Sequence, residues 1–115
     1  MLARKYKIKN AEDFDKVKRH GKLYQFKMFA VAILKREEDG DVSRYGFVIS
    51  KKISNLSTKR NRLRRILDDA VRYNVTRTKD GHDVVFLAKK TMNRSYTDDI
   101  MKEVDKALKK IGLVK

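Results

Sequence analysis

The sequence predicts a mixed α/β (α+β) two-layer sandwich whose elements follow the order α-β-β-β-α-β-α around a mixed sheet. One observation is a stripe of apolar residues at helical spacing, made of Leu63, Ile66, Leu67, Ala70 and Val71. A second is the apolar run 28–34, in which bulky and small side chains alternate as in an interior strand covered on both faces. A third is that strand patterns stand before and after this helix, which predicts a parallel pair joined by a crossover helix.

The N-terminal part predicts one short helix. Residues 1–9 form a basic lead-in that we expect to be extended. Asn10 is suited to cap a helix over residues 11–19, because Asp13 stands three positions on, as in a capping box. Phe14 and Val17 give this helix an apolar side, and Gly21 predicts its end.

Strand patterns follow up to residue 53. Residues 23–36 predict strand, with 23–26 as a separate short strand before a bend. The acidic segment 37–41 contains Asp-Gly and predicts a hairpin turn. The next strand is expected over residues 44–53, where Tyr45 and Phe47 share one side with Ile49 and Ile53.

The remaining elements are a helix at 58–74, a turn at Asp80-Gly81, a strand at 83–88 and a last helix at 97–111. No repeat or linker interrupts the 115 residues, so residues 1–115 are expected to form a single domain.

The charge balance predicts a polyanionic partner. Thirty Lys and Arg against fifteen Asp and Glu give a net charge of +15. Nucleic acid is the first inference from such a charge. We expect no membrane partner, because the longest apolar run is far shorter than a span. The lack of a signal-peptide core and of cysteine fits a cytoplasmic protein.

The residues offer no self-contained active site and no metal site. His20 and His82 stand at a helix end and in a turn, without metal-ligand spacing, so surface histidines are the favoured interpretation. The carboxylates gather in turns and at helix ends, and no glycine-rich phosphate loop is present. We therefore predict no catalytic residues.

The strongest motif is the basic segment that opens the 58–74 helix. Its members are Lys59, Arg60, Asn61, Arg62, Arg64 and Arg65, and the preceding strand pattern runs into Lys51 and Lys52. Arginine is suited to grip phosphate oxygens in pairs, and a helix N-terminus also favours phosphate. Farther along, Asp68 is spaced to pair with Arg64 and Arg72, and Asp69 with Arg65. We therefore expect the first half of the helix to bind and the second half to be structural.

These residues resemble the bacterial ribonuclease P protein subunit. The resemblance rests on the run 43–53, Ser-Arg-Tyr-Gly-Phe-Val-Ile-Ser-Lys-Lys-Ile, followed by Asn55 and the Arg-Asn-Arg helix at 60–65. Glu12-Asp13-Phe14-x-x-Val17, Gly21-Lys22 and Gly81-x-Asp83-Val84-Val85 are also similar to that family. The resemblance extends over about residues 6–108.

The resemblance implies a protein cofactor of a catalytic RNA. The RNA would remove the 5′ leader of precursor tRNA by metal-assisted hydrolysis, with Mg²⁺ in the complex and the protein inactive alone. Docking on the catalytic RNA would fall to Lys51, Lys52, Lys59, Arg60, Asn61, Arg62, Arg64 and Arg65. Leader contact would fall to Phe14, Lys18, Lys27, Ala30 and Ala32. The family also implies a left-handed crossover, whereas the pattern alone predicts the usual right-handed one.

Several positions depart from the family. Lys18 and Ala32 stand where aromatic residues are common, which reduces the stacking available to leader bases. Asp68 stands in place of a further arginine, and the connection before Arg60 is one residue longer.

Alternatives remain open at this point. Phe14 can be a core residue, Arg44 a solvated edge residue, and the basic segment a solvated helix face. The chain can also be a stand-alone RNA-binding protein, similar to a ribosomal protein. A helix-turn-helix DNA binder is disfavoured, and no DNA partner is expected, because a strand precedes the basic helix where that motif needs a helix.

Overall fold

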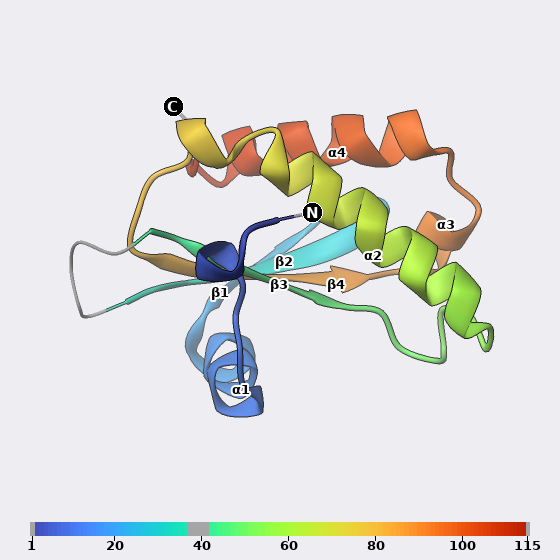
Figure 1. Cartoon of the computed structure of the whole chain (residues 1–115), viewed down its shortest axis with the longest axis horizontal. Coiled ribbons are helices and arrows are strands. Elements are labelled where there is room, and N and C mark those ends of the chain that lie inside the picture. Colours follow the sequence, from blue (N-terminus) through green and yellow to red (C-terminus); the bar gives the residue numbers. More distant parts are fainter. Residues whose placement is uncertain (1, 37–41, 115) are drawn as a thin grey trace.

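The computed structural model describes residues 2–36 and 42–114, which form a four-stranded mixed sheet with helices on both faces (Figure 1). The strands are β1 (Lys22–Gln25), β2 (Phe29–Lys35), β3 (Arg44–Val48) and β4 (His82–Ala88), in the spatial order β1-β2-β4-β3. The α-helices are α1 (Ala11–His20), α2 (Ser57–Arg72), α3 (Lys90–Asn93) and α4 (Thr97–Lys110). This confirms the predicted mixed fold.

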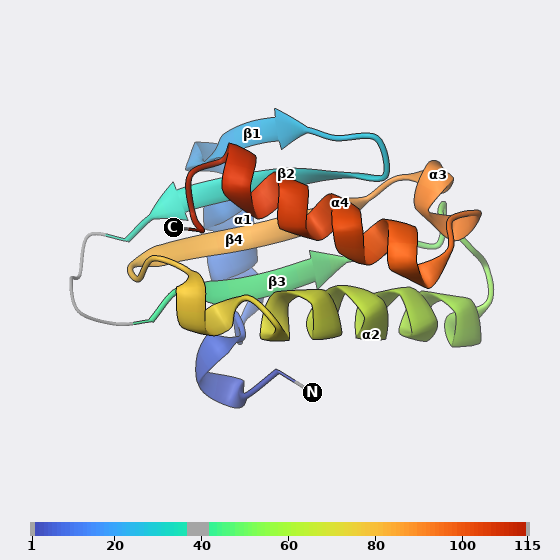
Figure 2. The ribbon, with the colours of Figure 1, turned by 90° about the horizontal axis from the view of Figure 1, so that it is seen from above.

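Two hydrophobic cores lie on opposite faces of the sheet. α2 and α4 cover one face side by side and α1 alone covers the other (Figures 1 and 2). The larger core joins side chains of α2, α4 and the sheet, among them Leu63, Leu67, Ile100, Val104, Phe29 and Phe86. The smaller core lies under α1 and consists of Ile8, Val17, Ala32 and Val85. The sandwich of sheet and α2/α4 thus carries α1 as a partial further layer.

The alternation in β2 places its residues as predicted for an interior strand. Phe29 and Val31 enter the larger core, and Ala32 enters the smaller one. β2 is paired on both sides, with β1 and with β4, both antiparallel. The separate short strand β1, followed by a bend, is also confirmed.

The connection between β2 and β3 differs from the prediction. The predicted turn at 37–41 lies outside the described residues, but a hairpin is wrong because β4 lies between β2 and β3. β3 pairs with β4 in parallel, as the crossover helix predicted. The handedness of this crossover stays a prediction.

Strand β3 is shorter than predicted. It ends at Val48, and residues 51–53 form a turn, so the predicted extension to Ile53 is wrong. The register gives the reason: β3 pairs with 83–87 of β4, and β4 itself ends at Ala88. Beyond that point no strand in the described part of the chain pairs with β3.

The helix ends largely agree with the sequence. The Asn10 side chain accepts a hydrogen bond from the Asp13 amide at 2.8 Å, which confirms the cap of α1. Gly81, at the predicted turn, has φ of +84°, a left-handed conformation that favours glycine. The sequence did not predict α3 or the 3₁₀ turns at Arg4–Tyr6 and Val75–Arg77, because elements of three or four residues are too short to show a periodic pattern.

Candidate nucleic-acid interface

The first half of α2 presents a basic surface to solvent. Leu63 and Leu67 are fully buried and fix the helix on the sheet. On the same helix the exposed side chains form what we call the α2 basic face, which consists of Lys59, Asn61, Arg62, Arg64 and Arg65. Lys51 and Lys52 are exposed in the turn just before the helix. The predicted docking residues are therefore brought together on the first half of α2 and the turn before it, except for the guanidinium of Arg60.

Arg60 is half-buried and has an internal partner. Its Nη1 donates a hydrogen bond to the Ser54 carbonyl oxygen at 2.8 Å. The bond ties the start of α2 to the connection that carries Lys51 and Lys52. Leu56, at the N-cap position, offers no side-chain cap.

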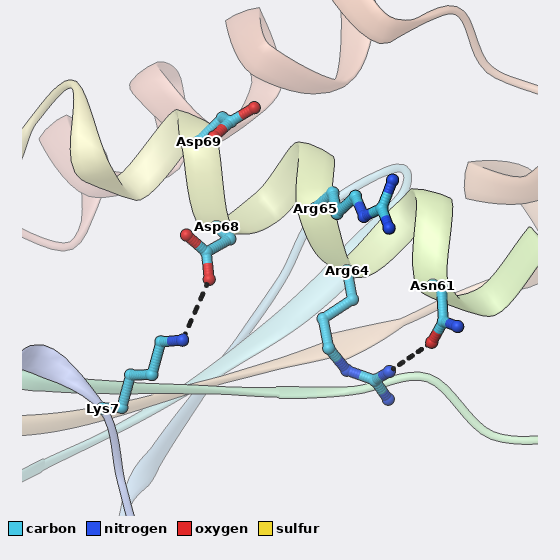
Figure 3. A pocket seen from close by; sticks show the side chains of 6 residues that line it. All are labelled: Lys7, Asn61, Arg64, Arg65, Asp68 and Asp69. Atoms are coloured by element: carbon cyan, nitrogen blue, oxygen red, sulfur yellow. Dashed lines mark hydrogen bonds and ion pairs between the residues drawn. The ribbon is translucent and has the colours of Figure 1, made fainter. Parts of the chain in front are cut away.

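A hollow of about 420 Å³ opens between the α2 basic face and the N-terminal segment, lined by Lys7, Asn61, Arg64, Arg65, Asp68 and Asp69 (Figure 3). Arg64 donates to the Asn61 amide oxygen at 3.2 Å. The figure shows Arg64 and Lys7 on either side of this hollow. Three cationic side chains stand against two carboxylates in this lining, and the arginines among them are suited to phosphate oxygens.

The predicted pairs of Asp68 and Asp69 are wrong. Asp68 is 6% exposed, and it accepts a hydrogen bond from the Leu2 amide at 2.5 Å and pairs with Lys7 Nζ at 3.7 Å. Asp69 pairs with Arg72 at 3.6 Å instead of Arg65. Asp68 therefore holds the N-terminal segment against α2, and the arginines of the basic face stay unneutralised by it.

A second opening, the α1 cleft, lies between α1, the end of β3 and the middle of α2. It has about 380 Å³ and is lined by Ala11, Phe14, Asp15, Lys18, Phe47, Val48, Ile49 and Arg64. The Phe14 ring is half-buried against Gly46. Arg64 lines both the α1 cleft and the hollow beside Lys7, so the two predicted contact regions adjoin at this side chain.

The predicted leader residues occupy different environments. Phe14 and Lys18 line the α1 cleft. Ala30 is buried, and Ala32 is 2% exposed and lies in the core beneath α1. Lys27 is exposed at the β1–β2 bend, where its carbonyl oxygen accepts a hydrogen bond from Thr91 of α3. Only Phe14 and Lys18 therefore share one opening.

Arg44 is a structural ion-pair residue. Its guanidinium donates two hydrogen bonds to Asp83, at 2.9 and 2.8 Å, and lies 3.3 Å from Asp13 of α1. The hydrogen bond with Asp83 raises the pKa of Arg44 above its ordinary value. These contacts join α1 to β3 and β4, so Arg44 is not a solvated edge residue.

Sequence reasoning missed Lys7 as a residue beside the basic face. A backbone bridge between Lys7 and Tyr45 places it there. No periodicity in residues 1–9 signals that contact. Within residues 2–36 and 42–114, no group of three potential ligand side chains could hold a metal ion. In the same part of the chain no helix has the length and hydropathy needed to cross a bilayer.

Comparison with known families decides the relationship. A model of the Ribonuclease P family matches residues 2–112. The chain belongs to the ribonuclease P protein family. Its sequence is 38% identical over 105 residues to the ribonuclease P protein component of Clostridioides difficile, covering 90% of this chain and 86% of that protein.

Solved ribonuclease P proteins have the same fold. The protein from Staphylococcus aureus superposes with a TM-score of 0.86 at 21% identity, covering 96% of this chain and 98% of that one. The protein from Thermotoga maritima gives 0.79 at 26% identity, covering 90% and 96%. The family resemblance drawn from the two basic motifs is therefore confirmed.

Proposed function

We propose that this ribonuclease P family member is the protein cofactor of a catalytic RNA that removes the 5′ leader from precursor tRNA. The RNA carries the chemistry, and the protein alone is inactive. We expect Mg²⁺ in the ribonucleoprotein and assign no protein ligand to it. We further propose that residues 1–115 form one RNA-binding domain that acts in the cytoplasm.

The observation that carries this proposal is the position of Arg64. It lines both the hollow on the α2 basic face and the α1 cleft. One RNA can dock on the basic face while a single strand enters the cleft beside it. A protein that only docks on one RNA needs no such second opening beside its binding helix.

We propose that the α2 basic face, with Lys51 and Lys52, binds the catalytic RNA through its backbone. Phosphate contacts hold a protein in register but carry no sequence information, and RNA duplexes are recognised largely by shape. The affinity should therefore fall steeply with salt, because each neutralised phosphate releases counterions. Arg60 contributes by fixing the connection through Ser54.

We propose that the leader enters the α1 cleft. Phe14 supplies an aromatic face in this cleft, and Lys18 supplies a charge for a phosphate. Ala32 would act as a small residue of the sheet beneath α1, where a larger side chain would lift the helix. Ala30, two positions earlier in β2, would share that face of the sheet. Lys27, at the β1–β2 bend, would meet RNA only outside the cleft.

The second candidate is a stand-alone RNA-binding protein. The basic face alone supports it, because that face needs no ribozyme to bind RNA. A helix-turn-helix DNA reader is disfavoured, since β3 and a turn precede α2.

The test is cleavage of a precursor tRNA by a bacterial ribonuclease P RNA at low Mg²⁺, with and without this protein. We expect stimulated cleavage at the mature 5′ end and no cleavage by the protein alone. If the protein binds that RNA tightly yet never stimulates cleavage, also with its cognate catalytic RNA, the stand-alone alternative replaces the proposal.

A further inference from the structure

Tyr96 is the most exposed large apolar side chain in the described part of the chain, at 79% exposure. It occupies the N-cap position of α4. Burial of its ring against the protein therefore contributes little to the fold. Single exposed tyrosines are common on protein surfaces, so exposure alone decides nothing.

The position of Tyr96 relative to α2 is what distinguishes it. Arg62 Nη2 lies 3.4 Å from Oγ1 of Thr97, the residue next to Tyr96. The beginnings of α2 and α4 lie at the same end of the molecule, where α3 also lies (Figures 1 and 2). The aromatic ring therefore stands at the margin of the α2 basic face.

A second exposed tyrosine at the other end of α2 provides the contrast. Tyr73 is 65% exposed, but the guanidinium of Arg72 lies 5.2 Å from its ring centroid. In the described part of the chain, Tyr96 has no aromatic or cationic partner for its ring. Its faces are free for an external ring.

We propose that Tyr96 stacks on an unpaired base of the catalytic RNA, while Arg62 holds a neighbouring phosphate. The inference rests on the proposed function, because docking of RNA on α2 is its premise. A positive surface with an interleaved aromatic ring is the combination that binds single-stranded nucleic acid. Every base has a π-face, so the contact should tolerate different bases at this position.

The binding test compares Tyr96→Ala, Tyr96→Phe and the matched control Tyr73→Ala, using a bacterial ribonuclease P RNA and, in a separate arm, precursor tRNA alone. Loss of one stacked base corresponds to a roughly 5- to 150-fold weaker Kd, which we expect for Tyr96→Ala with the catalytic RNA. Tyr96→Phe keeps the ring and should bind like the parent chain, as should Tyr73→Ala. The salt dependence should not change, because no charge is removed.

A fluorescence test reports on the contact directly. The chain contains no Trp, so Tyr96→Trp and Tyr73→Trp each introduce a single reporter. Addition of the catalytic RNA should quench the emission of the Tyr96→Trp variant and leave that of the Tyr73→Trp variant nearly unchanged.

The possible results separate this inference from the proposed function. If the parent chain binds the catalytic RNA and Tyr96→Ala binds it equally well, the stacking contact is refuted while docking on α2 stands. If Tyr96→Ala weakens only the binding of precursor tRNA, the assignment to the catalytic RNA is overturned. If the parent chain binds no RNA, both proposals fail together.

Discussion

The ring of Phe14 occupies the space that a side chain at Gly46 would need. A Cβ atom built on Gly46 would lie 2.4 Å from Phe14 Cε1 and 2.5 Å from Cζ. The φ angle of Gly46 is not positive, so its backbone conformation does not itself call for glycine. The position requires glycine because there is no room for a side chain. The glycine of β3 thus sets how closely α1 and its aromatic residue approach the sheet.

Gly46→Ala should displace the Phe14 ring and destabilise the protein. Overpacking of this kind typically costs about 1–3 kcal/mol. Urea denaturation would measure the free energy of unfolding. Phe14→Ala in the same chain should remove most of that cost, so the double-mutant cycle should show a coupling between the two sites. Equal stability of Gly46→Ala and the parent chain would contradict the close contact.

Asp83→Ala should leave the Arg44 guanidinium without its main partner. Asp83 is 5% exposed, and removing one member of a buried ion pair costs roughly 3–5 kcal/mol. Since the Arg44 side chain stays partly accessible, we expect a value toward the lower end. Chemical denaturation would measure it. Asp13→Ala is the control, because that more exposed pair should contribute about 0–1 kcal/mol. Equal losses from both changes would argue against the bidentate pair as the main tie.

Two adjacent aspartates of α2 should respond differently to removal. Asp68→Ala leaves the buried Leu2 amide without its acceptor, which costs about 1–3 kcal/mol. Asp69→Ala removes an exposed pair with Arg72 and should change stability by about 0–1 kcal/mol. Both variants gain the same helix propensity. The difference between their free energies of unfolding therefore measures what the contact of Asp68 with the N-terminal segment contributes. If the two variants match, Asp68 does not hold the N-terminal segment.

The elements predicted well from the sequence are those that local rules determine. The buried stripe of α2 repeats over two turns, and the Asn10 cap needs only the amide three residues away. Both depend on neighbours within a few positions along the chain, which is the range that periodicity and capping patterns describe.

The strand errors arise from distant pairing. Nothing near residues 37–41 signals that β4 separates β2 from β3, because β4 begins only at His82. Likewise Ile53 continues the alternation of β3, although the partner strand β4 has ended before that position. Strand length and neighbours are properties of the whole sheet.

The candidate site shows the same limit. The exposed arginines of α2 follow from helical geometry, and their positions agree with the prediction. The partner of Asp68 could not be predicted from helical geometry, because Leu2 is 66 residues away in the sequence. Tertiary packing there overrides the i,i+4 spacing that predicted pairs with Arg64 and Arg72.

Tyr45→Phe should flatten the stability profile of the protein at high pH. Burial, as the largest cause, raises the pKa of Tyr45 to about 12 from 10. Because the folded state holds this proton more tightly than the unfolded chain, stability is full below pH 10 and falls as the pH rises from 10 toward 12. The loss over that range amounts to about 2–3 kcal/mol. Denaturation of both proteins across pH 9–12 would measure the difference in slope. Parallel profiles would show that Tyr45 ionises equally well in both states.

Replacing Arg62, Arg64 and Arg65 together with Ala should weaken RNA binding and reduce its salt dependence. Each lost phosphate contact lowers the slope of log K against log salt by about 1, so the triple variant should lose about 2–3. Arg60 is left in place because its bond to Ser54 is structural. The control removes the same charge from exposed positions at the end of α4, with Lys106, Lys109 and Lys110 changed to Ala. Filter binding of a bacterial ribonuclease P RNA over a series of KCl concentrations gives both slopes. If the two triple variants lose affinity equally, net charge and not the α2 basic face holds the RNA.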